Sequence, residues 1–236
     1  MAETSRLALP LLEPAQAQKH VTVNEALVRL DALTQLVLGG VEMTTPPTTP
    51  AEGQVYAVGA GAVGGWSGRD HTLAVYQNGG WAFVSPDGGW SAWDASAGVP
   101  VTFDGVSWVE GAGAFSPNGA GFVQRALEVD HAVSSGATST VVGAIPADAI
   151  VYGITGRVLS TIGGATSLEV GVAGSTDRYG SGIGTSVGSW TRGITGTPLA
   201  YYAPTDLVLS AIGGNFDGSG TIRLAIHFAE LLLPRA

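Results

Sequence analysis

The clearest helical pattern in the chain lies within its first forty residues. Apolar side chains recur there at steps of three and four, at Val23, Ala26, Leu27, Leu30, Leu33 and Val37. This spacing predicts one amphipathic helix. Thr22 followed three residues later by Glu25 is a capping box, so we expect the helix to begin at Val23, and Gly39-Gly40 is expected to end it.

Such a helix must cover something with its apolar side. About two heptads are too few to hold a coiled coil alone. The apolar stripe must therefore cover either its own domain or copies of itself in an oligomer. We predict that it forms an anchoring or oligomerisation surface, made by Val23, Leu27, Leu30, Leu33 and Val37.

The proline-rich stretch 44–50 predicts a stiff, extended connector. Residues 53–110 hold short apolar runs broken by glycine-containing turns, which is typical of strands joined by tight hairpins. One motif occurs twice, as Tyr76, Asn78-Gly79 and Trp81, and then as Phe103, Asp104-Gly105 and Trp108. We predict one hairpin design used twice. Five of the six tryptophans lie in this segment, where they can fill a thin core or, for one or two of them, stack on sugar rings.

From residue 122 onward the β runs become longer and tryptophan becomes rare. Strands are predicted at 139–145, 150–161, 167–172, 207–212 and 221–228. In the last of these, Ile222, Leu224, Ile226 and Phe228 share one face, and Arg223 and His227 share the other, as in a half-buried antiparallel strand. The glycine-rich stretch 174–190 is interpreted as a long recognition loop.

The predicted fold is therefore mainly β, with four consecutive segments. Residues 1–43 form a helical anchor, 44–110 a small Trp-rich module of β-hairpins, and 111–121 a linker. Residues 122–236 form an antiparallel β-sandwich, similar to a jelly roll, which is the expected receptor-binding domain.

Composition narrows the classes of partner. Ten basic against nineteen acidic residues leave a net charge of −9, which argues against binding a nucleic-acid backbone. The chain has no cysteine, so disulfides and thiolate chemistry are excluded. Its beginning lacks the basic start and long apolar run of a signal peptide, and no apolar stretch is long enough to span a membrane. We expect synthesis in the cytoplasm without Sec export or membrane insertion.

Catalytic and cofactor motifs are weak. Six carboxylates could serve as acid and base in glycoside hydrolysis, but their spacing places no two across a cleft: Asp70, Asp87, Asp94, Asp104, Glu169 and Asp177. The glycine-rich stretches lack the context of a phosphate loop, and the four histidines are scattered. We predict no enzyme activity and no cofactor or metal, while a metal on the symmetry axis of an oligomer stays an alternative.

Carbohydrate binding requires a flat aromatic face and planar polar groups beside it. These residue types gather along the chain in one stretch of the C-terminal part, which is the candidate carbohydrate-binding set: Asp177, Arg178, Tyr179, Trp190, Arg192, Tyr201 and Tyr202. The alternative is that Tyr201 and Tyr202 precede a strand and merely pack, and that Asp177 and Arg178 form a solvent-screened turn pair.

Several motifs in residues 7–110 are similar to a known family. They are LPLLEPAQAQKHVTVNEAL at 9–27, LDAL at 30–33, PTTPAEGQVY at 47–56, AVYQNGGW at 74–81 and FDGVSW at 103–108. The chain here resembles phage-derived virion proteins of the DUF2793 type, found in alphaproteobacterial prophages and gene transfer agents. The turns DRYG at 177–180 and GGNF at 213–216 resemble the β-sandwich often attached to this family.

The resemblance implies a non-enzymatic head spike or tail fibre on the surface of a phage-like particle, which adsorbs to host capsular polysaccharide. Its partners would be further copies of the chain, expected as a homotrimer, and other capsid or tail proteins. Two alternatives remain: a capsule depolymerase, and a structural adaptor that joins the particle to a separate receptor-binding chain. The resemblance supplies no catalytic residues.

Overall fold

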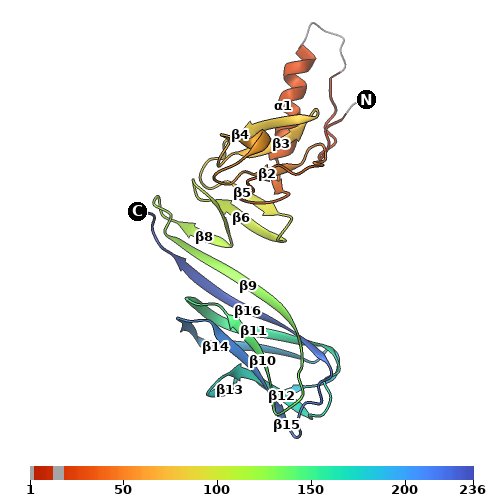
Figure 1. Ribbon diagram of the computed structural model, residues 1–236, viewed down its shortest axis with the longest axis vertical. Coiled ribbons are helices and arrows are strands. Elements are labelled where there is room, and N and C mark those ends of the chain that lie inside the picture. Colours follow the sequence, from red (N-terminus) through yellow and green to blue (C-terminus); the bar gives the residue numbers. More distant parts are fainter. Residues whose placement is uncertain (1–2, 13–18) are drawn as a thin grey trace. The chain divides into compact units, whose positions relative to one another are not determined.

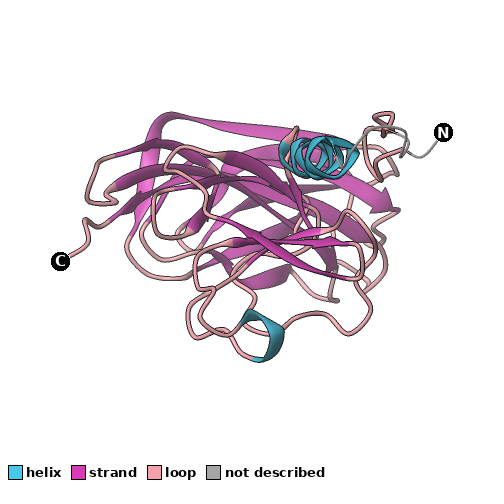
Figure 2. Cartoon of the chain, turned by 90° about the horizontal axis from the view of Figure 1, so that it is seen from above, coloured by secondary structure: helices cyan, strands magenta, loops and turns pink. Residues whose placement is uncertain are grey.

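The computed structural model describes residues 3–12 and 19–236, and it is mainly β, as predicted. Most of its elements are strands, and its helical parts are α1 and a short 3-10 turn, as the ribbon of Figure 1 and the cyan segments of Figure 2 illustrate. The chain divides into two compact units, with the boundary between Ala112 and Gly113. The predicted helical segment and the Trp-rich module fall together in unit 1, and the boundary lies inside the predicted linker.

Unit 1 is built on a seven-stranded sheet in the order β4-β3-β2-β1-β5-β6-β7. The central strand β1 runs parallel to both of its neighbours, β2 and β5, and the other pairs are antiparallel. The elements are α1 (Lys19–Leu33), β1 (Val37–Leu38), β2 (Val55–Ala57), a 3-10 turn (Gly64–Trp66), β3 (Leu73–Gln77), β4 (Gly80–Val84), β5 (Ser91–Asp94), β6 (Val99–Phe103) and β7 (Trp108–Glu110).

Both faces of this sheet are covered near its centre. Val55 and Ala57 of β2 join the cluster that includes Ala32 and Leu36, whereas the intervening Tyr56 joins a second cluster around Trp66. All three residues of β2 are buried. A strand buried on both faces does not alternate between apolar and polar residues.

The helix differs from its prediction at both ends. It begins at Lys19, so Thr22 lies inside it and not at its N-cap, and the Thr22 side chain is outside the described residues. It ends at Leu33, because Gln35 adopts a left-handed conformation with φ of 47° and Val37 enters β1. Among the predicted stripe residues, Val23, Leu30 and Val37 are exposed, and Leu27 and Leu33 are half-buried.

Two N-terminal side-chain interactions explain where the helix ends. The guanidinium of Arg6 donates hydrogen bonds to the backbone carbonyls of Asp31, Ala32 and Gln35, at 3.2, 2.8 and 2.9 Å. These carbonyls have no partner within the helix. The carboxylate of Asp31, which is 2% exposed, accepts hydrogen bonds from the Thr4 hydroxyl and from the amides of Arg6 and Leu7. A long-range contact thus overrides the weaker local signal of the glycine pair.

The two copies of the hairpin motif share their aromatic pairing but not their turn, which has two residues in the first copy and four (104–107) in the second. Asn78 and Gly79 both have positive φ, 51° and 73°, as a two-residue hairpin turn requires. The turn brings Tyr76 opposite Trp81, with ring centroids 5.0 Å apart, and the second copy brings Phe103 opposite Trp108 at 5.3 Å. Such cross-strand aromatic pairs are a main source of hairpin stability.

Unit 2 is a sandwich of two antiparallel sheets, in the orders β14-β11-β16-β9-β8 and β10-β15-β12-β13. Without the edge strand β8, this is the strand order of a jelly roll, as predicted. The strands are β8 (Ala112–Phe115), β9 (Gly121–Ala132), β10 (Thr138–Ile145), β11 (Ala149–Ser160), β12 (Ser167–Val172), β13 (Ser175–Gly184), β14 (Trp190–Tyr201), β15 (Thr205–Ile212) and β16 (Thr221–Leu232).

One apolar core joins the two sheets of unit 2. The predicted alternation in β16 is confirmed, because Ile222, Leu224, Ile226 and Phe228 are all buried in this core. Strands β9 and β16 pair over twelve residues and run side by side in Figure 1. The predicted linker and recognition loop are both partly strand, since β8 and β13 lie within them.

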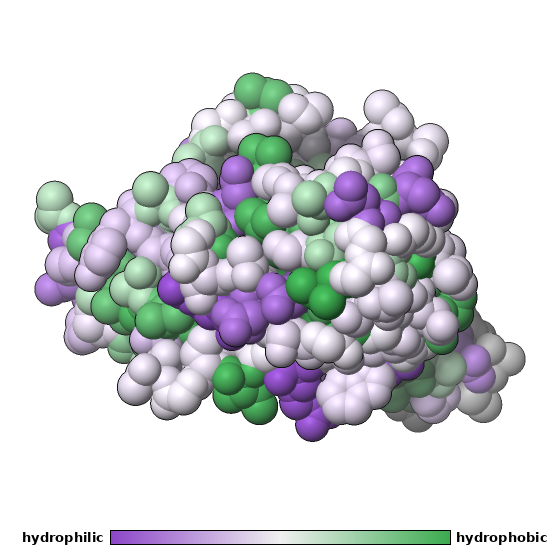
Figure 3. All heavy atoms as spheres, turned by 90° about the horizontal axis from the view of Figure 1, so that it is seen from below, coloured by the Kyte–Doolittle hydropathy of each residue, from purple (hydrophilic) through white to green (hydrophobic). Residues whose placement is uncertain are grey.

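The surface is mixed in character. No helix in the described ranges 3–12 and 19–236 is long and apolar enough to cross a membrane. Figure 3 shows hydrophobic and hydrophilic residues interspersed over small areas on the face that it views. This face therefore does not favour binding of a partner through one broad apolar area.

The Asp31 contacts give a testable prediction for stability. Asp31→Ala leaves three donors without their acceptor, two of them backbone amides, so we expect the free energy of unfolding of unit 1 to fall by about 2–3 kcal/mol. Urea unfolding followed by tryptophan fluorescence measures this, because five of the six tryptophans lie in unit 1. Exposed Asp87 provides the control variant Asp87→Ala, and equal stability of the two variants would contradict the role of Asp31.

Candidate binding groove on the outer sheet face

The outer face of the β14-β11-β16-β9 sheet carries two rows of polar side chains. The pairing register aligns Trp190, Arg157, Arg223 and Asp130 across the four strands, and in the next row Arg192, Thr155, Ala225 and Glu128. Side chains directly opposite one another in such a row have Cβ atoms about 4.5–5.5 Å apart. The register therefore gathers residues that are up to 95 positions apart in the sequence, from Glu128 to Arg223.

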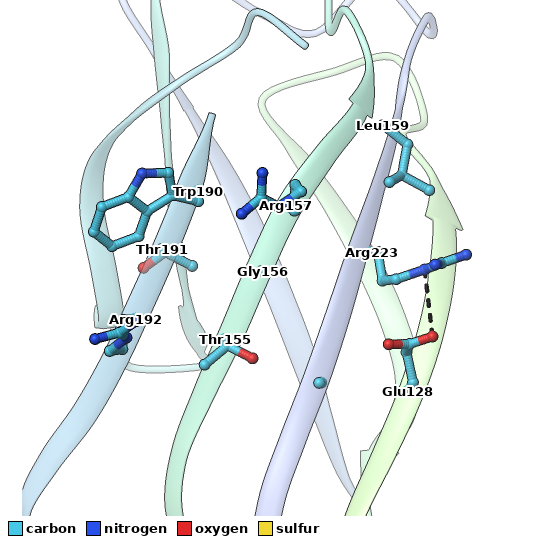
Figure 4. Close-up of a pocket in the computed structure, with 10 residues that line it drawn as sticks. Glu128, Thr155, Gly156, Arg157, Leu159, Trp190, Thr191, Arg192 and Arg223 are labelled. Carbon is cyan, nitrogen blue, oxygen red and sulfur yellow. Dashed lines mark ion pairs between the residues drawn. The ribbon is translucent and has the colours of Figure 1, made fainter. Parts of the chain in front are cut away.

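These rows line a concavity of about 460 Å³, which we call the outer groove. Figure 4 shows its residues spread over neighbouring strands, with Trp190 and Arg192 on β14 and Thr155 and Arg157 on β11. The lining residues are Glu128, Thr155, Gly156, Arg157, Leu159, Trp190, Thr191, Arg192, Arg223 and Ala225.

Arg223 is paired with acids on β9. Its guanidinium makes two hydrogen bonds to the carboxylate of Asp130, at 2.6 and 2.7 Å, and an ion pair with Glu128 at 3.4 Å. The hydrogen bond from Arg223 lowers the pKa of the Asp130 carboxyl, and Asp130 in turn raises the pKa of Arg223. With one guanidinium against two carboxylates, this side of the groove carries one excess negative charge at neutral pH.

The opposite side of the groove has unbalanced positive charge. Within the described part of the chain, neither Arg157 nor Arg192 has a carboxylate within ion-pair distance. The guanidinium carbon of Arg192 lies 5.9 Å from the ring centroid of Trp190, near the outer limit of a cation–π contact. Trp190 is 62% exposed, so a large part of its ring surface is open to solvent.

The structure separates the candidate carbohydrate-binding set into two places. Trp190 and Arg192 lie in the outer groove, at the beginning of β14, and Tyr201 is the last residue of the same strand. A twelve-residue strand spans roughly 35 Å at about 3.3 Å per residue. The set is therefore not one continuous binding site.

The second group surrounds the end of β14. Tyr201 and Arg178 line a different concavity of about 430 Å³, and Arg178 donates a hydrogen bond of 3.2 Å to the Tyr201 hydroxyl. Asp177 is exposed on β13, and Tyr202, which is 84% exposed, follows β14.

Tyr179 has a structural position within this second group. Its ring is fully buried in the sandwich core, because the stretch expected to be a loop is strand β13 and alternation turns Tyr179 and Ile183 inward. Its hydroxyl shares a hydrogen bond of 2.7 Å with that of Tyr201. Burial raises the pKa of Tyr179, and the bond to Tyr201 raises it further. The ring is thus not accessible to a ligand.

The carboxylates considered for catalysis are mostly engaged in local hydrogen bonds. Asp70 accepts from the amides of Gly61 and Ala62, and Asp94 from the amide and hydroxyl of Ser96. Asp104 likewise accepts from two amides of its own turn, and Glu169 from the hydroxyl of Thr176. Across the described residues, no three His, Asp or Glu side chains gather as a metal site.

Comparison with known proteins identifies one matching segment. Residues 23–109 match the family DUF2793, described as a protein of unknown function. The match covers less than half of the chain, and it confirms the resemblance to DUF2793-type proteins over those residues. No curated protein matches the chain.

Solved structures include a chain of the "Cyanophage Pam1 capsid asymmetric unit", with 24% sequence identity and a TM-score of 0.33. The alignment covers 50% of this chain and 91% of that chain. A TM-score of this size does not establish a shared fold.

Sequence reasoning missed half of the outer groove. Thr155 and Arg157 occur in a correctly predicted strand, and their alternation with buried Ile154 and Val158 was the available signal for an outward face. Glu128 and Asp130 lie in β9, where charged residues alternate with others, so the segment lacks the apolar run by which the other strands were predicted. Which residues meet across strands follows from the register, which the sequence alone does not supply.

The structural role of Tyr179 can be tested by removing only its hydroxyl. We expect Tyr179→Phe to lower the free energy of unfolding of unit 2 by about 1 kcal/mol, since one partly buried hydrogen bond is lost. Differential scanning calorimetry measures the change. Tyr202→Phe is the matched control, because exposed Tyr202 should tolerate the same change without effect. An unchanged transition in Tyr179→Phe would refute the structural role.

Proposed function

We propose that the protein is a non-enzymatic surface component of a phage-like particle, such as a gene transfer agent, and that unit 2 binds host cell-surface polysaccharide. The placement on a particle is supported by the motifs of residues 7–110, because the resembling proteins are virion spikes and fibres. Part of this stretch, residues 23–109, matches the DUF2793 family. The jelly roll of unit 2 is compatible with this role, but a fold alone does not define a function.

The observation that carries the binding proposal is the exposed indole of Trp190 within the polar rows of the outer groove. An aromatic face packs against the C–H side of a sugar ring, and the groups beside it can bond to the hydroxyls. Here these groups are the guanidinium of Arg192 and, one strand away, the hydroxyl of Thr155, which is hydrogen-bonded to His227 at 3.0 Å. A shallow groove on a sheet face suits an extended polymer.

The non-enzymatic part of the proposal is supported by the surroundings of the acidic residues. Glu128, which lines the outer groove, and Asp130 beside it are both paired with Arg223. Glycoside hydrolysis needs one carboxylic acid that holds a proton, and the lowered pKa of Asp130 works against that role.

Oligomerisation, expected as a homotrimer, would raise the strength of attachment. Single sugar contacts are weak, and tethered copies of one groove raise avidity without any new contact. Leu30 is 56% exposed on α1, and Val23 is exposed on the same helix, so both can meet neighbouring copies or another particle protein. Joined copies would present several outer grooves to one polysaccharide chain.

The binding proposal predicts the effect of truncating the indole. We expect Trp190→Ala to weaken binding to capsular polysaccharide about tenfold or more, a loss of about 1.4 kcal/mol. Biolayer interferometry of the purified protein on immobilised host capsule measures this. Trp93→Ala is the control, because Trp93 is an exposed tryptophan of unit 1 at 47%. Equal binding of Trp190→Ala and the unaltered protein to the capsule would exclude the outer groove as the polysaccharide-binding site. Release of reducing ends from the capsule would instead identify a depolymerase.

The anchoring proposal predicts that a charge on the exposed side of α1 impairs assembly or attachment without unfolding the protein. Because the Leu30 side chain is exposed, Leu30→Asp should leave both units folded, yet its charge should prevent helix association or attachment to the particle. Sedimentation equilibrium and particle purification measure the two effects. Val63→Asp places the same charge at another exposed apolar position of unit 1 and should behave as the unaltered protein. Normal assembly of Leu30→Asp would disprove the anchoring role.

A further inference from the structure

Two arginines stand directly opposite each other in the outer groove. The register pairs Arg157 of β11 with Arg223 of β16. Like charges at directly opposed positions destabilise a sheet. Arg223 is compensated by Asp130 and Glu128 on its far side, whereas the structure gives Arg157 no such acid among the described residues. Arg157 is exposed, and in Figure 4 its guanidinium points toward Trp190 and away from that of Arg223, so it is open to an anionic group from outside the chain.

The charge of the groove also departs from that of the whole protein. The chain has a net charge of −9 and only ten lysines and arginines in 236 residues. Even so, Arg157, Arg192 and Arg223 all line this one concavity, against Glu128 in its lining and Asp130 beside it, so one positive charge is left in excess. Keeping a surface hydrated does not require three arginines close together in a protein that is acidic as a whole. A ligand of opposite charge accounts for it.

We propose that the outer groove binds an anionic saccharide, with the carboxylate of a uronic acid unit held by Arg157 and Arg192 and a sugar ring stacked on Trp190. This inference rests on the proposed polysaccharide-binding function and specifies the chemistry of its ligand. The three residues lie on two adjacent strands, with Arg157 opposite Trp190 and Arg192 two positions along β14. One pyranose ring and its carboxylate can therefore reach all three side chains.

The residue types suit a carboxylate. A guanidinium presents two parallel N–H donors to the two oxygens of a carboxylate, which fixes the orientation of the ring that bears it. Thr155 lines the same groove, opposite Arg192 and two positions from Arg157 along β11, where its hydroxyl can bond to a ring hydroxyl. Because Arg157 and Arg192 are both exposed, salt should screen the attraction strongly.

The test compares uronic acid polymers with their own carboxyl-reduced forms. Polygalacturonate, alginate and hyaluronate, each beside its reduced counterpart, are presented to the full-length protein in about 50 mM and about 500 mM NaCl. We expect at least one acidic polymer to bind about tenfold more tightly than its reduced form at low salt. This preference should disappear at high salt.

Two variants test which concavity is responsible for the preference for the acidic polymer. Arg157→Gln should remove most of the preference for the acidic polymer and leave binding of the reduced polymer unchanged. Arg178→Gln removes the same charge from the concavity at the other end of β14 and should keep the preference. Circular dichroism checks that both variants are folded.

Each other outcome contradicts the inference. Equal binding of acidic and reduced polymers that depends on Trp190 would leave the proposed function intact and overturn the anionic specificity. A preference that survives Arg157→Gln but is lost in Arg178→Gln would assign the anion to the other concavity. Failure to bind any of the acidic polymers would also overturn it, and the capsule-binding assay then decides the proposed function independently.

Discussion

The register of the five-stranded sheet in unit 2 is the constraint on which the candidate site depends. Strands β9, β16, β11 and β14 pair so that one face buries Ile222, Leu224 and Ile226 in the sandwich core, while the other face presents the two polar rows of the outer groove. A slip of one residue would turn every side chain of a strand to the opposite face. The apolar core of the jelly roll therefore fixes the alignment of Trp190, Arg157 and Arg223, although none of these three belongs to the core. Residues of the core and residues of the proposed binding face therefore alternate along the same strands.

In unit 1, contacts between residues far apart in the sequence decide where the helix ends. The guanidinium of Arg6 satisfies the carbonyls at the end of α1, and the carboxylate of Asp31 holds the N-terminal segment beside the helix. The helix therefore ends early enough for Val37 and Leu38 to become the central strand of the sheet. The helical segment and the Trp-rich hairpins share one core as a result. Only the outward side of α1, with Val23 and Leu30, is open for contact with other molecules.

The sequence predicted the structure correctly wherever the pattern involved residues close together in the chain. The Asn78-Gly79 turn, the strands of the two repeated hairpins and the alternation in β16 were all predicted, because each depends on neighbouring residues. Signals failed where burial or pairing decided the structure. Strand β1 has two residues, too few to give a pattern, and β13 is rich in glycine, so its sequence favours a loop. For the site, residue type found Trp190 and Arg192, but Arg157 and Thr155 became candidates only when the register placed them beside β14.

The central claim is that saccharide recognition belongs to the outer groove of unit 2, where Trp190 is the sixth tryptophan and the five others lie in unit 1. The most direct measurement is a titration of the ¹⁵N-labelled full-length protein with capsule fragments, followed through the six indole N–H signals. The account predicts that the Trp190 signal shifts progressively and that the other five stay in place. Shifts confined to the indoles of unit 1, or a Trp190 signal that does not move while the fragments bind, would contradict it.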